Sequence, residues 1–101
     1  MARHESRSIG QLTLSSSTVS ATLTPASVGA ATVATQASFT VNGVVASDLV
    51  FCVRDPIANA TGILKVVPTA ANTVSITFVN PTAGALTPTT GAYTFLVVKT
   101  A

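Results

Sequence analysis

The groups that could perform acid, base or nucleophilic chemistry are few in this sequence. One histidine, three acidic residues and one cysteine occur in 101 residues, namely His4, Glu5, Asp48, Asp55 and Cys52. His4 lies near the N-terminus, and no Gly-x-Ser-x-Gly or similar nucleophile motif occurs elsewhere, so a Ser-His-Asp site is not predicted. Because acid–base and nucleophilic mechanisms need such groups close together, the sequence predicts a protein that is not an enzyme.

Two of the acidic residues, Asp48 and Asp55, bracket a predicted strand. An extended chain rises 3.3 Å per residue, which places these carboxylates about 23 Å apart, too far to act as a pair. No spacing of cysteine, histidine and acidic residues matches a zinc or calcium site, and no glycine-rich phosphate loop is present. We therefore expect neither a metal nor a cofactor.

Two further motifs have a structural interpretation. Cys52 lies in an apolar stretch, where an inert, packed thiol is expected, and a single cysteine cannot form an internal disulfide. This cysteine content fits synthesis in a reducing cytosol. The sequence Asn59-Ala60-Thr61 matches a glycosylation sequon, but that pattern has meaning only on a secretory route.

The composition indicates a surface poor in charge. Hydrophobic residues make up 48% of the chain and charged residues only 8%, with a net charge of +2, whereas average soluble proteins have roughly 25% charged residues. Seventeen threonines and ten serines supply hydroxyl groups instead. Burying threonine or alanine costs less than burying lysine or glutamate, so such faces suit contact with another protein. A free monomer with threonine-rich faces is the alternative.

Charge and hydropathy patterns also exclude two classes of partner. Nucleic-acid binders cluster basic residues on one face, whereas Arg54, Lys65 and Lys99 are widely separated here. No apolar run approaches the roughly 20 residues that cross a bilayer, and the N-terminus lacks the apolar region of a signal peptide. We therefore expect no nucleic acid and no membrane as partners.

The first eight residues differ from the rest, since they hold two of five basic residues, one of three acidic residues and the only histidine. We predict an extended N-terminal arm over residues 1–10 and one domain over residues 11–101. One interpretation of the arm is a solvated, disordered tail. The other is a segment that orders against a neighbouring subunit or larger surface, where its arginines pair with carboxylates. The candidate contact residues are Arg3, His4, Arg7 and Ile9.

Residues 72–88 have the clearest strand and turn pattern. Apolar Val74, Ile76 and Phe78 alternate with hydroxyl-bearing Thr73, Ser75 and Thr77. Because successive strand residues point to opposite faces, this period of two predicts one apolar and one polar face. The strand is expected to end at Asn80-Pro81, since proline lacks the N–H group that a sheet requires. The apolar run 92–98 is predicted to be its neighbour in the same sheet.

Weaker patterns predict more short strands, over residues 11–14, 18–23, 36–41, 48–54 and 63–67. In the segment 36–41, Ala37, Phe39 and Val41 are expected to share one face. Both faces of the segment 48–54 are largely apolar, which predicts a central strand or one covered on both sides. The serine run 15–17 is interpreted as a bend, and residues 25–35 and 68–71 as connections.

About six to eight short strands with frequent turn signals and no long helical pattern predict an all-β fold. The expected architecture is a single antiparallel β-sandwich, of jelly-roll or immunoglobulin-like type, with a closed β-barrel as the alternative. All five aromatic residues fall within strand patterns, so core packing explains them better than a glycan-binding platform. The predicted core consists of Leu23, Phe39, Val41, Leu49, Phe51, Val53, Val66, Val74, Ile76, Phe78, Tyr93, Phe95 and Val97.

Five segments carry a resemblance to a known family: residues 22–28, 36–43, 47–50, 71–88 and 91–95. The longest reads Ala-Asn-Thr-Val-Ser-Ile-Thr-Phe-Val-Asn-Pro-Thr-Ala-Gly-Ala-Leu-Thr-Pro, and the last reads Gly-Ala-Tyr-Thr-Phe. These strand and turn patterns resemble small β-sandwich virion proteins of tailed bacteriophages, over most of residues 20–98.

The resemblance implies a non-enzymatic part of the virus particle, most often a decoration or cement protein on the outside of the capsid. Such proteins are commonly trimers, so the implied partners are the major capsid protein and further copies of the chain. The implied location is the capsid surface, after synthesis in the host cytoplasm. We expect the threonine-rich faces and the N-terminal arm to make the capsid contacts. The alternative function is a tail or fibre accessory module that binds a host-surface glycan.

Overall fold

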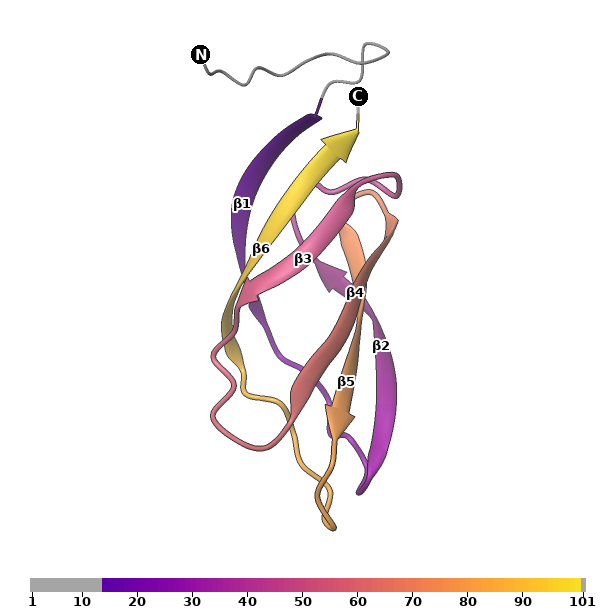
Figure 1. Cartoon of the computed structure of the whole chain (residues 1–101), viewed down its shortest axis with the longest axis vertical. Coiled ribbons are helices and arrows are strands. Elements are labelled where there is room, and N and C mark those ends of the chain that lie inside the picture. The colour runs from indigo at the N-terminus through magenta and orange to yellow at the C-terminus, as the bar shows by residue number, and fades with distance from the viewer. Residues whose placement is uncertain (1–13, 101) are drawn as a thin grey trace, which may run out of the picture.

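A computed structural model describes residues 14–100, which form two three-stranded antiparallel sheets and no helix. One sheet has the strand order β1-β6-β3 and the other β2-β5-β4. The two sheets pack against each other and do not close (Figure 1), so the predicted β-sandwich is confirmed and the barrel alternative is not. The strands are β1 (Leu14–Leu23), β2 (Thr32–Thr40), β3 (Leu49–Arg54), β4 (Gly62–Ala70), β5 (Thr73–Asn80) and β6 (Gly91–Thr100).

The chain passes repeatedly between the sheets. Among the described strands, only β4 and β5 follow each other within one sheet, joined by a tight turn in which Asn72 has a φ of 58°. The strands β5 and β6 are the central strands of different sheets, so the prediction that they are neighbours is wrong. Alternation shows which side chains face the core, whereas pairing depends on where the connection leads.

Besides β2, which begins at Thr32 within the predicted connection 25–35, two strands extend further than their sequence patterns indicate. The β1 strand runs through the serines at 15–17 without a bend, because its ladder with β6 is continuous from Leu14 opposite Thr100 to Leu23 opposite Gly91. The β4 strand continues through Pro68 to Ala70. Since β4 is an edge strand, proline interrupts no central ladder there. Tertiary pairing thus overrides weak local preferences in both strands.

An irregularity in β2 changes which side chains face the core. The register with β5 shifts between Gln36 and Phe39, and Ser38 has a φ of 71°. Gln36 and Phe39 are consequently both partly buried, while Ala37 is exposed. The prediction that Ala37 shares a face with Phe39 is therefore wrong. The Gln36 side chain instead donates to the carbonyl of Ala26 and accepts from its N–H group, both over 2.8 Å.

The core lies between the two sheets and contains most of the predicted residues. Phe39 packs edge-on against Phe78, with ring centroids 6.2 Å apart, an arrangement that aromatic pairs favour. The Tyr93 hydroxyl donates to the Thr89 carbonyl over 2.6 Å, and burial raises the pKa of Tyr93 to about 12. Val28, Val44 and Val50 are buried as well, although they were not predicted. The confirmed core comprises Leu23, Val41, Val74, Ile76, Phe78, Tyr93, Phe95 and Val97, with Phe39 and Val66 packed against it.

Three predicted core residues are exposed instead. Leu49, Phe51 and Val53 are 51%, 52% and 55% exposed. The reason is that β3 is an edge strand whose inward side chains are Val50 and Cys52. The prediction that β3 is central or covered on both sides is therefore wrong for the isolated chain.

A buried asparagine closes the end of the sandwich where the chain leaves β5. The Asn80 side-chain amide donates to the carbonyls of Val28, Gly29 and Gly84 over 3.1, 3.2 and 2.9 Å. Its carbonyl oxygen accepts from the N–H and hydroxyl of Thr82. One side chain thus ties the loop after β5 to the connection between β1 and β2.

Candidate interaction surface

The sequence-predicted contact residues Arg3, His4, Arg7 and Ile9 lie outside the described residues, as does the whole predicted arm over residues 1–10. Their contact role therefore stays a prediction. The described part of the predicted domain, residues 14–100, forms one sandwich.

The potentially reactive side chains of the described residues do not converge. Asp48 precedes β3 and Asp55 follows it, so the two aspartates lie at opposite ends of one strand, as predicted. Within residues 14–100, no three histidine, cysteine or acidic side chains are close enough to hold a metal ion. No helix in the same range could cross a membrane.

An ion pair fixes the start of β3. The Lys99 ammonium on β6 donates to the Asp48 carboxylate and to the Gly43 carbonyl, both over 2.7 Å, while the Val45 N–H donates to the same carboxylate over 2.9 Å. The hydrogen bond from Lys99, and then that from Val45, lower the pKa of the Asp48 carboxyl below its ordinary 3.8. The loop before β3 is thus fastened to the sheet in which β3 lies.

The lowered pKa of Asp48 predicts a loss of stability in acid. The folded state holds the carboxylate more tightly than the unfolded chain does, so this contribution is fully present above pH 3.8. It falls as the pH drops through the lower pKa of the folded state. Urea unfolding of the wild type and of Asp48→Asn, compared from about pH 6 to pH 2, should show the difference in stability shrinking towards low pH. A constant difference would contradict this role of Asp48.

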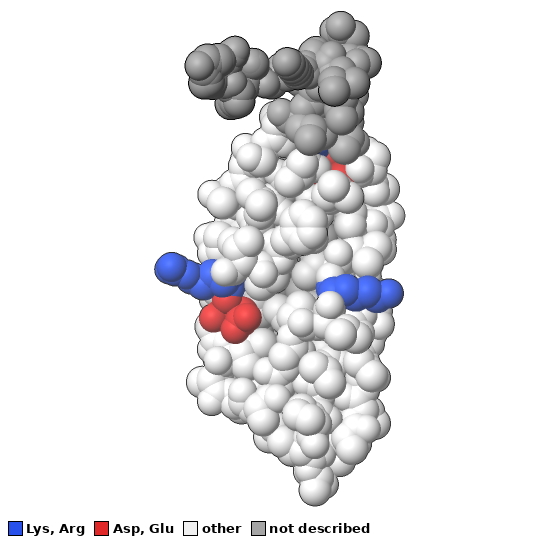
Figure 2. All heavy atoms as spheres, viewed as in Figure 1, with Lys and Arg blue, Asp and Glu red and all other residues white. Residues whose placement is uncertain are grey.

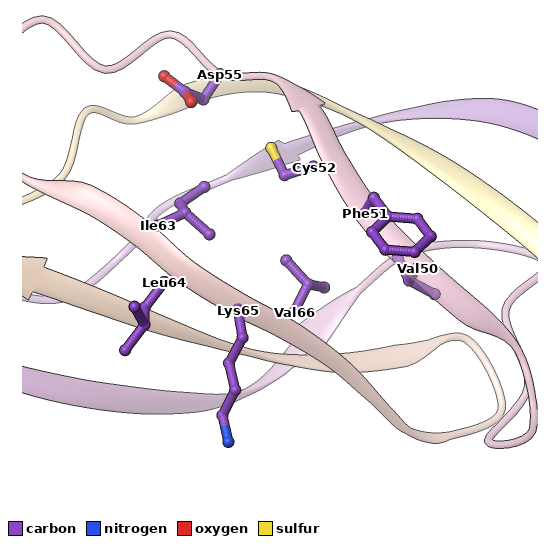
Figure 3. A pocket seen from close by; sticks show the side chains of 8 residues that line it. All are labelled: Val50, Phe51, Cys52, Asp55, Ile63, Leu64, Lys65 and Val66. Carbon is purple, nitrogen blue, oxygen red and sulfur yellow. The ribbon is translucent and has the colours of Figure 1, made fainter.

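A groove runs between β3 and β4 along one edge of the sandwich. It has a volume of about 420 Å³ and is lined by four residues from each side, all labelled in Figure 3. Ile63 and Val66 extend from β4 towards β3, whereas Leu64 and Lys65 point away from it (Figure 3). The two edge strands therefore enclose a groove whose lining is both polar and apolar.

Cys52 lies in this groove as a partly buried thiol. Burial raises the pKa of Cys52, and its S–H group donates weakly to the Arg54 carbonyl over 3.4 Å. A raised pKa keeps the thiol protonated and poorly nucleophilic. This environment agrees with the predicted inert thiol, although the side chain lies at the edge rather than deep in the core.

Exposed large apolar side chains gather beside the groove. Among the described residues seven such side chains are exposed, and five of them belong to β3 and β4. We call these five the edge patch: Leu49, Phe51, Val53, Leu64 and Val67. Single exposed apolar residues are ordinary, whereas five of them on two neighbouring edge strands make a candidate interaction surface. The edge patch is thus the strongest candidate functional site of the described residues.

Comparisons with known proteins add no family to this picture. No family model, curated protein or solved structure matches this chain. The candidate function therefore rests on the described surface and on the sequence resemblance.

The surface around the edge patch carries few charges. Figure 2 shows the face that bears β3 and β4, where uncharged surface separates charges of both signs on the left from a positive charge on the right. Hydroxyl groups occupy the outward faces of both sheets, where Ser20 contacts Thr94 and Thr35 contacts Thr77 over 3.1 and 2.8 Å. The expectation that hydroxyls replace charges as outward polar groups is confirmed for this part of the chain.

The edge patch was missed by the sequence analysis, although its signal was present. A strand with apolar side chains on both faces needs cover on both faces. The pattern in residues 48–54 predicts a central strand or one covered on both sides, with Leu49, Phe51 and Val53 in the core. The structure places β3 at an edge, where the outer side chains of Leu49, Phe51 and Val53 are exposed.

Proposed function

We propose that this chain is a non-enzymatic structural protein of a bacteriophage virion, a decoration or cement protein that binds the major capsid protein on the outer head surface. In this proposal the chain is made in the host cytoplasm, assembles as a homotrimer and stabilises the head. The phage context comes from the sequence resemblance.

The observation that supports an adhesive role is the edge patch. Phe51 and Leu64 are 52% and 63% exposed on a small sandwich whose remaining described surface has few charges and many serines and threonines. Such a surface is buried against a protein at little desolvation cost. On a symmetric shell many copies bind side by side, so contacts that are weak singly become strong through high effective concentration.

The glycan-binding alternative has less support from the described surface. Of the five aromatic side chains, only Phe51 is exposed, while Phe78, Tyr93 and Phe95 are buried and Phe39 is partly buried. One exposed phenyl ring within an apolar strip suits a protein partner better than a polar sugar.

Purified heads of the phage that encodes this chain provide the test. We expect the chain to copurify with tail-free heads, to rebind heads that lack it, and to raise their thermal disruption temperature in calorimetry. Deletion of residues 1–10 should lower retention if the arm takes part, and Arg3→Gln with Arg7→Gln keeps the arm's length as a matched control. Presence on tails alone, or hits on a glycan array without head binding, would overturn the proposal.

A further inference from the structure

The groove beside the edge patch is lined by one acidic side chain after β3 and one basic side chain on β4. Asp55 follows β3 and Lys65 lies in β4, and both line the groove (Figure 3). Within residues 14–100 neither side chain forms an ion pair, because the described ion pair joins Asp48 and Lys99. The Asp55 carboxylate accepts one hydrogen bond, from the Ile57 N–H over 3.1 Å. Arg54 directly precedes Asp55, so the β3 side carries charges of both signs, and Asp55 is the group on that side that complements Lys65 on the β4 side.

The size of the patch limits what can cover it. Five roughly half-exposed side chains on the two sides of the groove together present on the order of 400 Å² of apolar surface, about as much as the largest apolar patch on a typical monomer. That area is about half of the ~800 Å² that each partner gives to a standard protein interface. The hydroxyl-bearing surface around the patch can supply the remainder. A folded domain of low charge therefore fits this edge better than a short peptide does.

We propose that the occupant is a second copy of this chain, with the β3 side of one copy packed against the β4 side of the next. The chain itself carries the required partner surface, apolar and nearly uncharged. In this arrangement Leu49, Phe51 and Val53 of one copy meet Leu64 and Val67 of another. Asp55 then faces Lys65 across the interface. In a closed ring, every copy contributes both its β3 side and its β4 side. A ring of two copies and a ring of three copies therefore make the same kind of contact.

This inference rests on the self-association within the proposed function but not on binding to a shell. The experiments therefore use the isolated full chain without capsids. If the chain does not bind capsids, the inferred association between copies is unaffected. If the isolated chain is monomeric, the inference is overturned whatever the capsid experiment shows.

Two valines give a matched pair for the first test. Val53 in the edge patch is 55% exposed and Val33 in β2 is 54% exposed, so Val53→Lys and Val33→Lys place the same charge at equally exposed strand positions. Sedimentation velocity over a range of concentrations should show a wild-type dimer or trimer. We expect Val53→Lys to weaken association roughly tenfold or more and Val33→Lys to leave it unchanged. Should Val53→Lys unfold, Leu64→Lys tests the opposite side of the patch.

A charge exchange tests which sides meet. Asp55→Lys and Lys65→Asp should each weaken association, because like charges then face each other, and the double variant should restore it. Mixing the two single variants should restore association in a ring of two copies, because opposite charges then meet at both contacts. In a ring of three copies two neighbours are the same variant, so like charges meet at one interface and association is not fully restored. A wild-type monomer, equal effects at Val33 and Val53, or a double variant that stays dissociated would overturn the proposed interface.

The only cysteine of the chain supplies an independent readout. Cys52 lines the groove, so covering the edge should slow its reaction with a maleimide or disulfide reagent. The raised pKa of Cys52 slows this reaction equally at all protein concentrations, whereas coverage by a second copy grows with concentration. The labelling rate should therefore fall as the wild type associates and stay constant for Val53→Lys. A concentration-independent rate for the associated wild type would place the interface elsewhere.

Discussion

Replacing Asn80 with alanine is expected to lower the free energy of unfolding by about 2–4 kcal/mol, because it removes a buried side chain together with the hydrogen bonds that this side chain donates and accepts. The Asn80 side chain is fully buried and serves three carbonyl groups and the N–H of Thr82. Asn80→Asp should lower the free energy of unfolding at least as much. It keeps the acceptor oxygen, but it replaces the donating NH₂ group by a second oxygen, which the same carbonyl oxygens repel. Urea unfolding followed by fluorescence or circular dichroism measures both changes.

Asn59 provides the matched control for Asn80. It begins the same Asn-x-Thr pattern, accepts from the N–H of Thr61 and donates to the Thr87 carbonyl over 2.9 Å, but its side chain is exposed. Water can replace these partners, so Asn59→Ala should cost only about 1 kcal/mol. Equal losses for the two asparagines would show that burial of Asn80 does not set the size of the effect.

Truncating Phe78 to alanine should destabilise the fold by about 3–5 kcal/mol, as is usual for a buried aromatic residue. Phe78 is fully buried in the central strand β5 and contacts Phe39 edge-on. Its removal leaves a cavity between the sheets that the surrounding strands can fill only partly. Single domains are commonly stable by about 5–15 kcal/mol, so this change removes a large share of the total. The unfolding midpoint in urea reports it directly.

Phe51→Ala separates core packing from contact with a partner. The same truncation at a half-exposed edge position should change the stability of the monomer by less than about 1 kcal/mol. The measurement belongs at concentrations where the protein is monomeric, so that lost association does not register as lost stability. A cost at Phe51 comparable to that at Phe78 would mean that the edge patch is structural core after all.

Side-chain alternation was enough to predict the fold class and most of the core. Val74, Ile76 and Phe78 face inward in β5, and Tyr93, Phe95 and Val97 face inward in β6, as the period of two indicated. Alternation is a local property, and the orientation of each strand follows from it directly. The placement of β5 and β6 in different sheets depends on distant pairing, which local patterns do not contain.

Other features could not be predicted because a single residue controls them. The irregularity at Ser38 changes which of the neighbouring side chains point towards the core. The sequence Gln-Ala-Ser-Phe does not predict the φ of 71° at Ser38. Asn80 was interpreted as the end of a strand, whereas its side chain connects two loops that are distant in the sequence.

The edge patch shows a different limit of prediction from sequence. The apolar pattern of residues 48–54 was recognised, and the error lay in assigning the cover to the same chain. A sequence records that a side chain needs burial but not which molecule buries it. The predicted contacts of Arg3, His4, Arg7 and Ile9 lie outside the described residues and stay a prediction.

The antiparallel ladder between β1 and β6 has a mechanical consequence. Leu14 lies opposite Thr100, so a pull applied at these two residues loads the hydrogen bonds one after another, as in opening a zipper. When two strands slide past each other, all the hydrogen bonds between them resist together. When two strands peel apart, these hydrogen bonds break one at a time. Tension along the polypeptide would therefore strip β1 from its sheet at low force, while a load spread over the outer faces would meet the full resistance of both sheets.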